Sequence, residues 1–174
     1  LKQINRGNFV TLQRKSKLMK CSNNDHAAGR RELVEEIMRL KRDKKAVILA
    51  HYYVDGSIQD IADHVGDSLA LAQKAAATAA DAEIVVMCGV DFMADTVKVL
   101  CPDKKVLVPD MAAGCSLADS CPADEFEAFV KAHPGYTVIS YVNTSVAVKA
   151  LSDVLVTSGN ARKIVESFPQ DAKL

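Results

Sequence analysis

Two periods of apolar and polar positions run along most of this chain. Residues 30–43 place Leu33, Ile37 and Leu40 on one face of a predicted amphipathic helix. Short continuous apolar runs follow and predict strands within residues 44–53, 83–90, 104–110, 136–144 and 153–159. The segments between them are expected to be helices, at residues 57–66, 67–80, 91–100, 121–133, 145–153 and 160–168. Short apolar strands that alternate with helices are typical of parallel sheets covered on both faces, so the predicted fold class is α/β.

A repeat is present within this alternation. A shift of 90 residues without a gap lays residues 47–53 over 137–143, Asp63 over Asp153 and Ser68 over Ser158. Each half then contains a strand, polar residues at its carboxyl end, a helix, a second strand and a serine that opens a helix. The second half lacks counterparts of the strands near Cys88 and Val106. The pattern therefore predicts repeated three-layer αβα units with short parallel sheets, of which one complete unit and part of a second are present.

The repeat also predicts how the chain is divided. We expect residues 1–30 to be a disordered or non-native tail, residues 31–118 to be the first αβα unit and residues 119–174 to be an incomplete second unit. The first 20 residues carry six Lys or Arg, no acidic residue and no apolar period. Met19 is therefore a candidate for the true start of the protein.

Composition narrows the range of partners. The 22 basic and 22 acidic residues cancel, whereas binding to nucleic acid or to a membrane surface calls for a clustered basic excess. No run approaches the length of a membrane span and no signal-peptide core is present, so a soluble, cytoplasmic protein is expected. The chain is 49% hydrophobic and only 5% aromatic, without Trp, which predicts a core of Ala, Val, Leu and Ile.

Candidate binding residues lie where strands end. In parallel α/β sheets, ligands bind outside the carboxyl ends of the strands, and helix N-termini favour anions. His51 and Tyr53 follow one predicted strand, and Tyr141 and Asn143 follow its repeat partner. Ser68 and Ser158 are each expected to open a helix, where a hydroxyl and free backbone N–H groups suit a phosphate or carboxylate. A plain helix cap is the alternative for each serine taken alone.

Of the five cysteines, Cys115 is the one whose position suggests a chemical role. Five cysteines without an export signal do not suggest a disulfide scaffold. Cys115 sits in a Gly-Cys-Ser turn after a predicted strand, on the side where the other candidates gather. Cys88 ends an apolar strand, and Cys101 and Cys121 each precede a proline, which favours packing or loop roles for these three. A thiolate here would be a nucleophile with His51 as its base, or one ligand of a metal whose other ligands lie elsewhere.

Residues 66–69 spell GDSL, the letters that head a family of serine hydrolases. In that interpretation Ser68 is the nucleophile. The family also needs a late Asp-x-x-His pair to complete its triad, and the sequence contains none. A GDSL-type hydrolase is therefore an alternative with weak support.

Several long motifs, in order, resemble the quinolinate synthase family. They are AHYY with SIQDIADHVGDSLALA, then CGVDFMADTVKVLCPDKKVLVPDMAAGCSLADSCP, then SYVNTSVAVKALSDVLVTSGNA. The resemblance runs from about Arg31 to Leu174. It implies three similar α/β units around a pseudo-threefold axis with the active site at the centre, so that this chain would hold little more than half of a full member. Gly159 departs from the family, which usually has a second serine there.

The resemblance implies a reaction and a cofactor. Members condense iminoaspartate with dihydroxyacetone phosphate to quinolinate, the precursor of the NAD pyridine ring, and an aspartate-oxidising enzyme upstream is a possible partner. They use a 4Fe–4S cluster held by three cysteines, of which Cys115 matches the first and two are expected beyond Leu174. His51 and Tyr53 match residues that handle substrate and protons, and the matches to substrate-binding residues are His51, Ser68, Tyr141, Asn143 and Ser158.

One cysteine cannot replace three, so we expect the isolated chain neither to hold the cluster nor to catalyse. An inactive remnant that binds phosphorylated or dicarboxylate metabolites is the third alternative.

Overall fold

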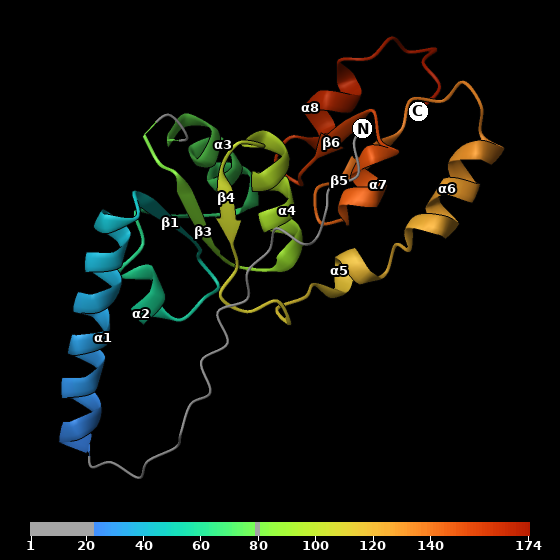
Figure 1. Ribbon diagram of the computed structural model, residues 1–174. Helices are drawn as coiled ribbons and strands as arrows, with labels where there is room; N and C mark the ends of the chain where they lie inside the picture. The colour runs from blue at the N-terminus through green and yellow to red at the C-terminus, as the bar shows by residue number, and fades with distance from the viewer. Residues whose placement is uncertain (1–22, 79–80) are drawn as a thin grey trace.

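The computed structural model describes residues 23–78 and 81–174. Figure 1 shows a parallel sheet of four strands with helices on both faces, followed by a smaller pair of strands. In the larger sheet the strand order is β2–β1–β3–β4. Its strands are β1 (Ala46–His51), β2 (His64–Gly66), β3 (Ile84–Cys88) and β4 (Lys105–Leu107), and its helices are α1 (Asn23–Asp43), α2 (Gly56–Gln59), α3 (Ser68–Thr78) and α4 (Asp91–Leu100).

The two faces of this sheet bury separate apolar clusters. On one face Leu49 and Met87 pack against Leu71 of α3 and Val97 of α4, in the larger cluster. On the other face Ile48 and its neighbours contact apolar side chains of α1 and α2. Successive strand residues point to opposite faces, so a strand buried on both sides must be apolar throughout. The run AVILA in β1 meets that demand, and the predicted three-layer αβα arrangement is confirmed.

The remaining elements belong to a second, smaller αβ arrangement. They are α5 (Ser116–Asp119), α6 (Ala123–Ala132), β5 (Ile139–Tyr141), α7 (Val146–Ala150), β6 (Val154–Val156) and α8 (Ala161–Glu166). Strands β5 and β6 pair in parallel, and α7 lies between them in sequence as the crossover helix. In Figure 1 these elements lie beyond α4, and α4 contacts α7.

The strand register and the cap of the first helix repeat after 90 residues. The pairing of Leu49 with His64 in β1 and β2 recurs as Ile139 with Val154 in β5 and β6. Helix α2 is capped by the Asp55 side chain, and α7 is capped by Ser145 at the equivalent position. Two halves with unlike sequences therefore share one backbone frame.

An aspartate fixes the register of each strand pair. The Asp63 carboxylate accepts from the Ile48 N–H at 2.8 Å, and the Asp63 N–H donates to the Ile48 carbonyl at 2.8 Å. Asp153 does the same with Val138, at 2.9 Å in both directions. The first strand of each pair is thereby held at two points by the residue that precedes the second strand.

Several predicted elements are wrong in part. The helix predicted at 57–66 ends at Gln59, and its last three residues form strand β2. The N-terminal helix starts at Asn23, inside the segment expected to be a tail, and residues 1–22 lie outside the described residues. The pattern of apolar positions does not predict the short helix α5.

No helix within residues 23–78 and 81–174 is both long and apolar enough to cross a membrane.

Candidate functional site

A cavity of about 470 Å³ opens where the two repeats face each other at the carboxyl ends of their strands. Six residues predicted from the sequence line it: His51, Tyr53, Ser68, Tyr141, Asn143 and Ser158. The polypeptide leaves β1 and β5 at this end, and the segments after β2 and β6 complete the wall. The cavity therefore brings together side chains that lie about 90 residues apart in the sequence.

His51 begins an aromatic cluster at the end of β1. Its ring stacks on Tyr52 at 4.5 Å between centroids and meets the Tyr53 ring edge-on at 4.7 Å. The Tyr53 N–H donates to Nδ1 of His51 at 3.3 Å, so the neutral ring carries its proton on Nε2. Burial lowers the pKa of His51, and the Asp67 carboxylate opposes that shift. His51 is therefore a neutral hydrogen-bond donor near pH 7, beside a Tyr53 side chain that is 81% exposed.

The two serines lie in equivalent segments with different caps. Ser68 is the first residue of α3, and the preceding Asp67 accepts from the Ala70 N–H at 2.8 Å, which makes Asp67 the N-cap. Ser158 does not open a helix as predicted, because it lies in a turn and α8 begins at Ala161. In that turn Asn160 reaches back and accepts from the Thr157 N–H at 2.7 Å.

Asn143 links the cavity to Cys115. The Nδ2 of Asn143, in the loop after β5, donates to the sulfur of Cys115, in the segment between β4 and α5, at 3.9 Å. Cys115 is half-buried, packs against the larger core cluster and precedes α5 as its N-cap residue. The thiol predicted to carry chemistry is thus within contact of a cavity residue, although it does not itself line the cavity.

The donor set for a metal is incomplete in this part of the molecule. Among the described residues, no group of three or more His, Cys, Asp or Glu side chains is placed to hold a metal ion. Cys88 and Cys101 are buried, and burial raises the pKa of both thiols, that of Cys88 to about 11. Of the cysteines in the described residues, Cys115 and Cys121 are only partly buried, and Cys115 is the one that contacts a cavity residue.

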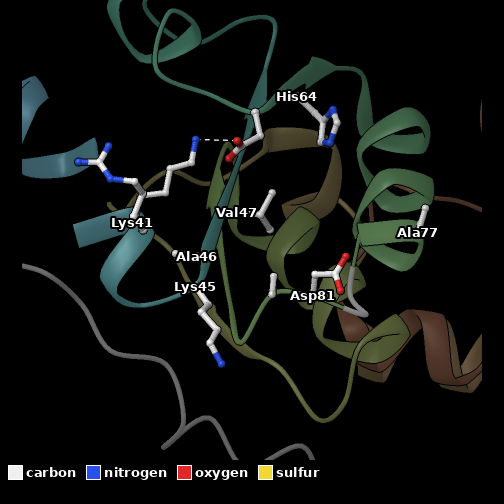
Figure 2. Close-up of a pocket in the computed structure, with 10 residues that line it drawn as sticks. Lys41, Lys45, Ala46, Val47, His64, Ala77 and Asp81 are labelled. Carbon is white, nitrogen blue, oxygen red and sulfur yellow. Dashed lines mark ion pairs between the residues drawn. The ribbon is translucent and has the colours of Figure 1, made fainter. Parts of the chain in front are cut away.

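A second cavity lies at the opposite end of the strands of the large sheet, where β1 and β2 begin (Figure 2). It has a volume of about 530 Å³, and its lining includes Lys41, Arg42 and Lys45. Two of these cations are already paired: Lys41 with Asp63 at 2.6 Å and Lys45 with Glu83 at 2.7 Å. The amino ends of the strands rarely hold the chemistry of α/β proteins, so the smaller cavity is the candidate site.

The sequence prediction missed several lining residues: Tyr52, Asp67, Leu69, Val142, Thr157, Gly159 and Asn160. Asp67 and Thr157 occupy equivalent positions in the repeat, each one residue before a predicted serine. The 90-residue shift identifies both turns as candidates. A search for serine hydroxyls alone misses the other residues of these turns.

Comparison with known proteins assigns the chain to a family. The family model for quinolinate synthetase A protein matches residues 35–174. Quinolinate synthase from Thermosynechococcus vestitus is 59% identical over 143 residues, which cover 82% of this chain and 44% of the relative. The Synechocystis enzyme of the same name is 56% identical over 144 residues, covering 83% of this chain and 45% of the relative. The chain thus spans less than half the length of these relatives, and it belongs to the quinolinate synthetase A family.

Proposed function

We propose that this chain provides one complete repeated unit and part of a second in a quinolinate synthase, which condenses iminoaspartate with dihydroxyacetone phosphate in NAD biosynthesis. The observation that carries the proposal is the cavity of about 470 Å³ in which six residues matching the family's site residues meet. On this proposal the protein is a cytoplasmic transferase, and an enzyme that oxidises aspartate supplies its first substrate.

His51 and Tyr53 are proposed to move protons. A neutral imidazole that donates through Nε2 suits a substrate carbonyl or hydroxyl, and a neighbouring phenol can accept or return the proton. Ring contacts at 4.5 and 4.7 Å hold the His51 ring against both tyrosines, which limits the rotation that would otherwise misplace its Nε2.

Ser68, Tyr141, Asn143 and Ser158 are proposed to bind the charged groups of the two substrates. Their hydroxyl and amide groups lie in one cavity. Such groups donate hydrogen bonds, and phosphate and carboxylate oxygens are strong acceptors. Asn143 also touches the Cys115 sulfur, so a substrate bound at Asn143 would lie close to that thiol.

Cys115 is proposed to be one of three cysteine ligands of a 4Fe–4S cluster. When bound, such a cluster supplies a Lewis-acidic iron that polarises a substrate oxygen. The part of the chain that the structure describes contributes one suitable thiol to this cluster.

The test is a chimera in which residues 35–174 replace the matching part of the Thermosynechococcus vestitus enzyme. We expect anaerobic formation of quinolinate from iminoaspartate and dihydroxyacetone phosphate, and loss of at least about 100-fold in rate on His51→Ala. Leu155→Ala, on β6 outside the cavity, is the control variant and should keep the rate. A folded chimera that forms no quinolinate would refute the proposal.

The GDSL alternative gains no support. Its four letters fall inside the family match, and nothing in the comparisons favours a hydrolase. Binding of dihydroxyacetone phosphate by the 174-residue chain without quinolinate formation would instead support the metabolite-binding alternative.

A further inference from the structure

Lys149 is a half-buried cation at the contact between α7 and α4, outside the cavity lining. Its Nζ donates to the Thr144 carbonyl and lies 5.1 Å from the centre of the Phe92 ring on α4. Burial lowers the pKa of Lys149 to about 8, and the carboxylates of Asp95 and Asp91 oppose that shift. Burying an ammonium is unfavourable, so the contacts of Lys149 must offset that cost.

The Thr144 carbonyl anchors the loop that carries Tyr141 and Asn143. Thr144 is itself buried, and its Oγ1 donates to the Tyr141 carbonyl at 3.2 Å. Its N–H donates to the Val142 carbonyl at 2.9 Å. The bond from Lys149 therefore holds the far end of a tight turn whose two outward side chains line the candidate site.

Through its contact with Phe92, Lys149 is also connected to the segment that carries Cys115. Phe92 lies at the start of α4, and the N–H of the preceding Asp91 donates to the Ala113 carbonyl at 3.0 Å. Ala113 is two residues before Cys115, and Cys115 in turn touches Asn143. Lys149 thus connects the two segments that must stay in register for Asn143 to face the thiol.

The first repeat shows which part of this interaction is general. Gln59 is the equivalent of Lys149, and its Nε2 donates to the Val54 carbonyl at 2.8 Å, where Val54 is the equivalent of Thr144. A neutral amide is thus sufficient to hold the turn. What the ammonium adds in the second repeat is attraction to the Phe92 ring and to the carboxylates of Asp91 and Asp95.

We propose that Lys149 is a positioning residue, which fixes the turn carrying Tyr141 and Asn143 and thereby holds Asn143 against Cys115. The inference uses the residues of the proposed site but does not depend on which substrates bind there. The Lys149 side chain does not need to touch a reacting group for this role.

The experiment measures iodoacetamide alkylation of individual thiols in the 174-residue chain by peptide mass spectrometry. Lys149→Met removes the donor and keeps an unbranched side chain that is one atom shorter. We expect it to speed alkylation of Cys115 by about three- to tenfold, because one lost hydrogen bond shifts a local opening by that factor. Cys121, in the same segment of the chain, should keep its rate, and buried Cys88 should stay unreactive.

Lys149→Gln is the conservative variant, because it places at this position the residue that the first repeat has at Gln59. It should keep the Cys115 rate within about twofold of the wild type, since it retains a donor for the Thr144 carbonyl. An unchanged Cys115 rate in a folded Lys149→Met chain would overturn the proposal. So would acceleration of Cys115 and Cys88 together, which would mean general loosening, or failure of the glutamine to restore the rate.

If the methionine variant does not fold, the glutamine variant is the test. Faster alkylation of Cys115 in Lys149→Gln than in the wild type overturns the proposal, and a wild-type rate supports it. Thiol alkylation needs no substrate or cluster. Failure of this test therefore leaves the proposed function standing, and failure of the quinolinate test leaves the role of Lys149 standing.

Discussion

Removal of the Asp63 carboxylate should destabilise the protein far more than removal of its repeat partner Asp153. Both carboxylates accept a backbone N–H fifteen residues earlier, at 2.8 and 2.9 Å. Asp63 differs in its surroundings, because it also pairs with Lys41 at 2.6 Å, and these two side chains are only 29% and 17% exposed. The N–H it accepts belongs to Ile48, which is buried in the smaller core cluster.

The magnitude follows from these contacts. Asp63→Ala leaves the buried Ile48 N–H unpaired, at a cost of about 1–3 kcal/mol. It also leaves the Lys41 ammonium without its partner, and for a pair of this exposure we take about 1–2 kcal/mol, below the range for fully buried pairs. The total expected for Asp63→Ala is about 3 kcal/mol. Asp153→Ala exposes an N–H near the surface and should cost about 1 kcal/mol.

The assay is urea unfolding followed by far-UV circular dichroism, with asparagine variants as a second pair. Asparagine keeps an oxygen for the backbone N–H and removes the charge, so Asp63→Asn should lose only the part due to Lys41, and Asp153→Asn should be nearly neutral. In a Lys41→Met background the two alanine variants should move closer together, by about the same 1–2 kcal/mol. Equal costs for Asp63→Ala and Asp153→Ala in the wild-type background would refute the reasoning from burial.

Three further outcomes are expected. Burial lowers the pKa of His51 while Asp67 raises it, so an NMR titration should place the His51 midpoint below 6.5, and Asp67→Asn should lower it further; a rise would contradict this assignment. Burial raises the pKa of Cys88 to about 11, so at pH 8 about one thiol in a thousand is ionised, and Cys88 should resist iodoacetamide until urea unfolds the chain. Gly89→Ala would place a Cβ 3.0 Å from the Met93 sulfur and 3.1 Å from the Met87 methyl carbon, so urea unfolding should show a loss of about 1–2 kcal/mol, whereas Gly56→Ala, with open space around it, should not show this packing cost.

The alternation of apolar strands and helices is enough to predict the α/β class, because strands buried on both faces must be apolar throughout. Strand β2 cannot be found in that way. Its three residues, His64, Val65 and Gly66, lie at the edge of the sheet, and Val65 is 46% exposed. The strand exists because Asp63 and the register with β1 hold it, and these are long-range interactions that no local period reports.

The repeat contains the missing information. The apolar run at 153–159 predicts a strand, and the 90-residue shift carries it onto residues 63–69, where β2 lies. The helix predicted at 57–66 follows from the local pattern alone and ignores the strand that the repeat implies. Four of the six predicted site residues are easier to predict, since they need only the ends of strands β1 and β5 and no exact helix boundaries.

Lys149 marks the limit of such reasoning. In the sequence it is an ordinary lysine in a short helix, and its proposed role comes from burial against α4, which packs on the four-stranded sheet.

The shared backbone frame does not make the two turns at the cavity electrostatically equivalent. At the first, the Asp67 carboxylate caps α3 next to Ser68, and it would repel a phosphate or carboxylate bound there. At the second, Thr157 replaces that aspartate and Asn160 supplies the side-chain bond, so the turn around Ser158 carries no charge of its own. The Asp67 carboxylate partly offsets the effect of burial on the pKa of nearby His51, so its charge lies beside the residues proposed to move protons. If the cavity binds dihydroxyacetone phosphate as proposed, Ser158→Ala should therefore weaken binding of the phosphate more than Ser68→Ala.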